Sequence, residues 1–114
     1  MNEKEITING KQYPVKFDMQ AMMNFEEITG ESFFNAKLES LKSRIALIIS
    51  AAIAADSQSK ITVEELKGEG DIKAIMAIVT AYKTVSELMA DFFTVPAIEQ
   101  QNEPEPSDGE SAKN

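Results

Sequence analysis

Residues 5–17, EITINGKQYPVKF, alternate apolar and polar side chains on either side of Asn9-Gly10. An Asn-Gly pair between two such runs predicts a β-hairpin, because a type I′ turn needs positive φ at both central positions. With a two-residue turn, Ile6 lies opposite Tyr13. The apolar side chains of the two strands then share one face of the ribbon: Ile6, Ile8, Tyr13 and Val15. A lone hairpin is marginal in water, so this face must lie on helices or on another chain.

The residues that follow the hairpin predict a first helix over about 19–29. Asp18 is a suitable N-cap, and Gly30 is typical of the residue that ends a helix. The next segment, SFFNAKL at 32–38, predicts a short helical turn with two adjacent phenylalanines. A capped helix and a helical turn therefore come directly after the second strand.

Two further helices are predicted in the middle of the chain. Ser40 precedes a helix over about 41–56, whose apolar residues surround most of the cylinder, as in a central, nearly enclosed helix. After a polar loop, Thr62 and Glu65 have the spacing of a capping box, in which each side chain binds the other residue's backbone N–H. That spacing predicts a short helix, which Gly68 ends.

The longest predicted helix runs over about 72–94, after the N-cap Asp71, and carries two apolar stripes. One stripe contains Ile72, Ile75, Met76, Val79 and Tyr82 and continues to Met89 and Phe93. The other contains Ile78, Ala81, Val85, Leu88 and Phe92. A surface helix of a small domain needs only one stripe. The helix is therefore either buried on two sides, or one stripe meets another protein, and the sequence leaves both alternatives open.

Beyond Pro96 the chain reads AIEQQNEPEPSDGESAKN, which is too poor in apolar residues to offset the entropy of ordering. Residues 96–114 are thus predicted to be a disordered acidic tail or linker. Residues 1–95 are predicted to form one helical domain with an N-terminal β-hairpin. The expected fold is mostly α with a small β element (α+β), a compact bundle of about four helices.

Composition excludes several classes of function. The chain has no cysteine, no histidine and a net charge of −8, and Arg44 is its only arginine. A nucleic-acid surface needs clustered basic residues, and the commonest general base and the best nucleophile are both missing. The most apolar run, residues 45–55, is about half the length that spans a bilayer. We therefore expect no catalytic, cofactor-binding or metal-binding residues, no enzymatic activity, and no nucleic-acid or membrane partner.

Apolar residues on the predicted helices are the candidates for contacts with other proteins. Methionine suits surfaces that accept varied partners, although it also fills irregular cores. Each pair of adjacent phenylalanines should place one ring in the core and leave the other for an interface or partial exposure. The candidate partner-binding residues are Met22, Met23, Phe33, Phe34, Val85, Leu88, Met89, Phe92 and Phe93. The apolar surplus also favours a homo-oligomer.

The stretch ITINGKQYPVKFDMQAMMNFEEITGESFF, residues 6–34, resembles the phage tail assembly chaperones of long-tailed siphophages. The likeness consists of a strand, an Asn-Gly turn, a second strand ending in an aromatic residue, a capped helix and the FEEITGESFF segment. The helical remainder and the acidic tail fit the size and order of that family without diagnostic residues.

The resemblance implies a function in virion morphogenesis, in the cytoplasm of the infected bacterium or a prophage host. Such proteins bind the long helical tape-measure protein, help recruit tail-tube subunits around it, and are absent from the mature virion. The family often makes a longer product by frameshifting, in which residues 96–114 would link to a second domain. The alternative, from a different class, is a helical adaptor or regulatory subunit of a bacterial complex.

Overall fold

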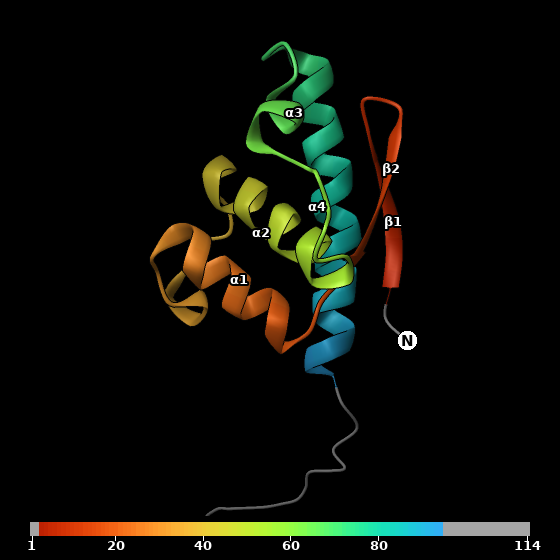
Figure 1. Cartoon of the computed structure of the whole chain (residues 1–114). Helices are drawn as coiled ribbons and strands as arrows, with labels where there is room; N and C mark the ends of the chain where they lie inside the picture. Colours follow the sequence, from red (N-terminus) through yellow and green to blue (C-terminus); the bar gives the residue numbers. More distant parts are fainter. Residues whose placement is uncertain (1–2, 95–114) are drawn as a thin grey trace, which may run out of the picture.

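The computed structural model describes residues 3–94 and begins with the predicted hairpin (Figure 1). Strands β1 (Glu3–Ile8) and β2 (Lys11–Lys16) pair antiparallel, and Ile6 lies opposite Tyr13. Asn9 and Gly10 have φ values of 53° and 79°, as a type I′ turn requires. The apolar face is buried, which confirms the predicted register: Ile6, Ile8, Tyr13 and Val15.

Helix α1 (Met19–Thr29) has the predicted ends. The Asp18 carboxylate accepts a hydrogen bond from the Ala21 N–H at 3.1 Å, which satisfies one of the free donors of the first turn. At the other end, Gly30 adopts φ 75° and its N–H donates to the Glu26 carbonyl at 2.8 Å. The predicted turn after α1 is the 3-10 helix η1 (Phe33–Asn35).

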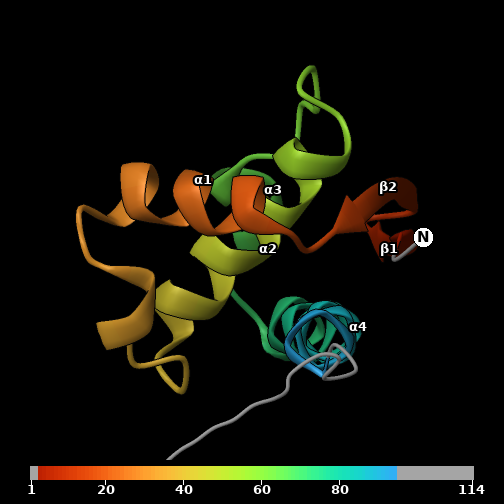
Figure 2. The same ribbon diagram turned by 90° about the horizontal axis from the view of Figure 1, so that it is seen from below.

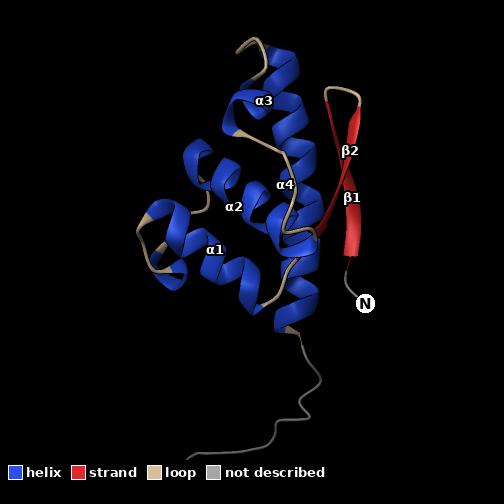
Figure 3. Ribbon diagram, viewed as in Figure 1, coloured by secondary structure: helices blue, strands red, loops and turns tan. Residues whose placement is uncertain are grey.

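Helix α2 (Leu41–Ala55) is the central element and packs against α1, β2 and α4 (Figure 3). Every residue from 45 to 52 is buried, which confirms the expected enclosed helix. Ser50 lies in this stretch, and its hydroxyl donates to the Ala46 carbonyl at 2.7 Å. Leu41 is half exposed, because the first turn of α2 extends beyond the core.

Helix α3 (Val63–Lys67) forms with only half of the predicted capping box. The Thr62 hydroxyl accepts from the Glu65 N–H at 3.1 Å. The prediction for the Glu65 side chain was wrong, because this carboxylate accepts from the Tyr13 hydroxyl and pairs with Lys11 at 3.4 Å. The hairpin supplies a phenol and an ammonium group at this point, and these two groups contact the carboxylate.

Helix α4 (Ile72–Phe93) begins at the predicted N-cap, where the Asp71 carboxylate accepts from the Ala74 N–H at 3.2 Å. The buried side chains of α4 all belong to its second stripe: Ile78, Ala81, Val85 and Leu88. Seen nearly along the α4 axis, α2 and the hairpin lie on one side of this helix (Figure 2). Among the described elements, α4 is therefore covered on one side and not on two.

The predicted fold class, mostly helical with an N-terminal hairpin, is confirmed. The predicted tail, residues 96–114, lies outside the described residues. None of the helices within residues 3–94 has the length and apolar character needed to cross a membrane.

Candidate interaction surface

All six phenylalanines of the chain meet in one cluster, although they come from four separate segments. Phe17 follows β2, Phe25 lies on α1, Phe33 and Phe34 lie in η1, and Phe92 and Phe93 end α4. Ring centroids are 5.5 Å apart for Phe17 and Phe92, and 6.5 Å apart for Phe33 and Phe93. The cluster therefore joins the hairpin exit, α1, η1 and the last turn of α4.

The cluster has a buried base and an exposed rim. Phe17, Phe25 and Phe33 are buried, whereas Phe34 and Phe93 are 71% and 51% exposed and lie 6.5 Å apart. We call Phe34 and Phe93 the aromatic edge. Both rings contact Phe33 beneath them, at 5.5 Å and 6.5 Å. The edge is thus two apolar rings that buried aromatic side chains hold in place, and the expectation of one core ring per pair is confirmed for Phe33-Phe34.

A second apolar surface lies on the first two turns of α4, on the side away from α2. Its members recur at helical spacing, and all are exposed by between 44% and 66%: Ile72, Ile75, Met76 and Val79. We call these four residues the α4 patch. The same stripe is partly covered at Tyr82, where the Arg44 guanidinium lies 4.5 Å from the ring centroid, and at Met89, which packs against the core, and it is exposed again at Phe93.

The structure separates the nine predicted partner-binding residues into three groups. Phe34, Phe93 and Met23 are exposed. Met22, Met89 and Phe92 are half-buried and pack against the core. Val85, Leu88 and Phe33 are buried in the core and present no surface to a partner in this structure.

The α4 patch was not among the predicted partner-binding residues. The sequence contained a signal for it, because the patch is the N-terminal half of the first apolar stripe. Deciding which stripe faces the core required the position of α2 and the hairpin around α4, which helical periodicity alone does not give.

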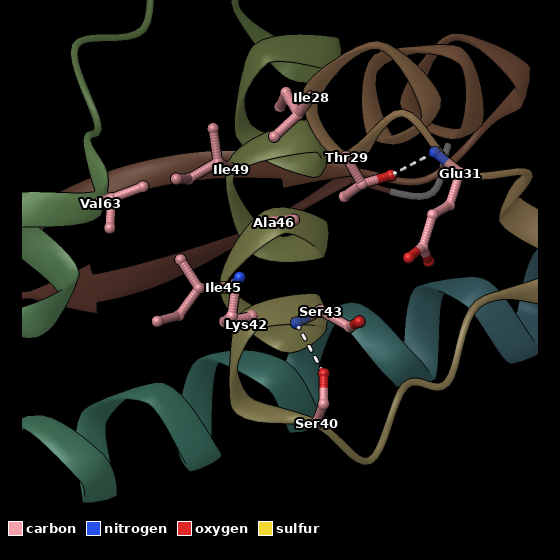
Figure 4. Close-up of a pocket in the computed structure, with 10 residues that line it drawn as sticks. All are labelled: Ile28, Thr29, Glu31, Ser40, Lys42, Ser43, Ile45, Ala46, Ile49 and Val63. Atoms are coloured by element: carbon pink, nitrogen blue, oxygen red, sulfur yellow. Dashed lines mark hydrogen bonds between the residues drawn. The ribbon is translucent and has the colours of Figure 1, made fainter.

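A cleft of about 460 Å³ opens between the C-terminal end of α1 and the first half of α2 (Figure 4). One part of its lining is apolar, with Ile28, Ile45, Ile49 and Val63. Two of its hydroxyls bind backbone: Thr29 accepts from the Glu31 N–H at 3.1 Å, and Ser40 accepts from the Ser43 N–H at 3.1 Å. Within residues 3–94, acidic side chains form no group able to hold a metal ion.

The most perturbed titratable group, Tyr13, belongs to a structural contact. A hydrogen bond to the Glu65 carboxylate raises the pKa of Tyr13 to about 12, and burial and the negative charge of Glu65 act in the same direction. A phenol with a raised pKa is a weaker acid than usual and keeps its proton at neutral pH. The backbone carbonyl of the same glutamate also accepts a hydrogen bond from the Asn9 side-chain amide at 3.0 Å. This group of contacts fixes the hairpin turn to α3.

Comparison of the chain with protein-family models, with curated proteins and with solved structures finds no match.

Proposed function

We propose that this chain is an assembly factor of the phage tail assembly chaperone type, which acts by binding other proteins and not by catalysis. Its first partner would be the tape-measure protein. The observation that carries the proposal is the aromatic edge, where Phe34 and Phe93 are exposed over a buried aromatic base. Large rings held in position lose little conformational entropy on binding, and such anchors dominate the affinity of protein interfaces.

A helical partner suits this edge. An amphipathic helix presents apolar side chains at spacings of three and four residues, which can seat on two rings whose centroids are 6.5 Å apart. The tape-measure protein is expected to be long and helical, with apolar surface that needs cover before the tail assembles. The net charge of −8 would help to keep such a complex soluble.

The acidic segment fits the same role. Residues 96–114 carry five acids and one lysine, so about half of the net charge follows α4 directly in the sequence. Recruitment of tail-tube subunits, and action in the bacterial cytoplasm, rest on the resemblance of residues 6–34 to the tail chaperones. The hairpin, the capped helix α1 and η1 follow one another in the order of that pattern.

The proposal is tested by co-expression with the tape-measure protein of the same tail gene cluster. The chain should raise the amount of soluble tape-measure protein and co-purify with it. Phe34→Asp and Phe93→Asp should each reduce co-purification at least tenfold, because each places a charge in an apolar contact. Leu41→Asp is the matched control, since Leu41 is 50% exposed but lies outside the phenylalanine cluster.

Two results would count against the proposal. If the amount of soluble tape-measure protein does not change, tape-measure binding is wrong and the adaptor alternative becomes the better one. If co-purification survives both phenylalanine substitutions in folded variants, the aromatic edge is not the contact. Circular dichroism and thermal unfolding of each variant identify those that have lost the fold.

A further inference from the structure

We propose that the α4 patch binds the α4 patch of a second copy of this chain, with the two helices antiparallel about a twofold axis. This inference does not depend on the proposed function, because it uses a different surface from the aromatic edge. It rests on the open face of α4, on the register of the four apolar residues, and on the charges at the two ends of the patch.

The face that carries the α4 patch has no neighbouring element among residues 3–94. Figure 2 shows α2 and the hairpin together on one side of α4, and the buried residues of α4 that face them are Ile78, Ala81, Val85 and Leu88, not the patch. The four side chains are exposed by between 44% and 66% and follow one another along the first two turns of the helix. A second helix can therefore approach along this face without displacing any described element.

The spacing of the patch is self-complementary. In an antiparallel pair with its twofold axis between residues 75 and 76, Ile72 meets Val79 of the other copy and Ile75 meets Met76 of the other copy. Each large apolar side chain thus faces another one, and none faces a charge. A closed twofold contact requires this property, since the same surface must serve as both partners.

The charges at the ends of the patch match the same arrangement. Exposed Glu69 precedes the patch, and exposed Lys83 follows it by one helical turn. Antiparallel pairing brings the end of one patch, with Lys83, over the start of the other, where Glu69 lies in the turn before α4, so that two symmetry-related ion pairs can form. A parallel pair would instead place like charges together at both ends, which is unfavourable.

The size of the patch predicts a weak dimer. Four half-exposed side chains make an apolar area of a few hundred Å² per copy, which is in the range that marks interaction sites. With the stem of Lys83 and the polar rim, the pair would bury about 1,000 Å² in total, near the lower limit for specific contacts. We expect a dissociation constant in the micromolar range. The average mass of the protein in solution should therefore rise with protein concentration.

Cross-linking tests the antiparallel register directly, because the chain has no cysteine of its own. Mixing the Ile72→Cys and Val79→Cys variants with a short bis-maleimide should give a cross-linked dimer at least fivefold faster than the Ile72→Cys variant alone. Equal rates, or faster reaction of the Ile72→Cys variant alone, would overturn the antiparallel arrangement.

Sedimentation of the full chain between about 5 and 500 µM tests the surface itself. Wild-type protein should approach the dimer mass, while Met76→Asp should stay monomeric because it places two carboxylates beside the axis. Met19→Asp, at an equally exposed methionine of α1, should still dimerise. Glu69→Lys and Lys83→Glu should each weaken the dimer, and the double variant should restore it.

The outcomes separate the possible occupants of the patch. A monomeric wild type at every concentration overturns the proposal, as does a dimer that Met76→Asp leaves intact. Loss of tape-measure binding in Met76→Asp, together with a monomeric wild type, would assign the patch to that partner. Should Met76→Asp fail to fold, Glu69→Lys, Lys83→Glu and the double variant decide the question, because both positions are exposed and outside the core.

Discussion

At the scale of single residues, Glu65 shows how one side chain can connect two parts of the fold. Its carboxylate accepts from the Tyr13 hydroxyl and pairs with Lys11 at 3.4 Å, and its backbone carbonyl accepts from Asn9 at 3.0 Å. Three hairpin residues are thereby held by one residue of α3. The capping-box spacing indicated a different role for Glu65, because local spacing contains no information about a strand that is more than fifty residues away.

Tyr13→Phe is expected to lower the free energy of unfolding at pH 7 by about 1–2 kcal/mol, since it removes a hydrogen bond to a charged and partly buried group. Chemical denaturation of the variant and the wild type gives the difference. Tyr82→Phe is the control, because it keeps the Tyr13–Glu65 contact. A cost for Tyr13→Phe that is no larger than for Tyr82→Phe would show that the contact adds nothing to stability.

The same contact predicts a dependence of stability on pH. The pKa of Tyr13 is raised from 10.0 to about 12 in the folded state, so the folded protein holds this proton more tightly than the unfolded chain. The stabilisation is therefore fully present below pH 10 and is lost as the pH rises from 10 through about 12. Wild-type protein should lose more stability over this range than Tyr13→Phe. Because both proteins have the same lysines, the difference between their stability curves comes from the Tyr13 phenol. Parallel curves would contradict the assignment.

At the scale of elements, the sequence predicted most of the fold, because each helix has its own start signal. Asp18, Thr62 and Asp71 cap the helices that they were expected to cap, and Ser40 caps the helix that it was expected to precede. The hairpin register followed from Asn9-Gly10. The choice between the two stripes of α4 depended instead on tertiary packing, as did the exposure of Leu41 within the apolar pattern of α2.

Two leucines of α2 test this distinction between pattern and packing. Leu47 is fully buried and Leu41 is 50% exposed, although both contribute to the apolar pattern of the helix. Leu47→Ala should cost about 2–4 kcal/mol of unfolding free energy because it leaves a cavity in the core. Leu41→Ala should cost less than about 1 kcal/mol. Equal costs, measured by denaturant unfolding, would contradict the position of α2 in the core.

At the scale of the whole molecule, the phenylalanine cluster connects distant segments and also supplies the proposed binding edge. The sequence indicated that each adjacent pair would divide between core and surface. It did not indicate that the two pairs meet each other, with Phe34 and Phe93 6.5 Å apart. That meeting depends on how η1 and the end of α4 pack around Phe17, which no local pattern describes. The aromatic edge is therefore a property of the assembled fold.

The adjacent residues Phe33 and Phe34 allow stability and binding to be separated. Phe33 is buried, and its ring lies 5.6 Å from both Phe17 and Phe25, so Phe33→Ala should cost about 3–4 kcal/mol of unfolding free energy. Phe34→Ala removes a ring that is 71% exposed and should cost less than about 1 kcal/mol, while weakening binding of the tape-measure protein. Denaturant unfolding and a binding titration of both variants measure the two effects. If Phe34→Ala destabilised the fold as much as Phe33→Ala, the exposed ring would be part of the core, and the aromatic edge could not be a surface that is free to bind.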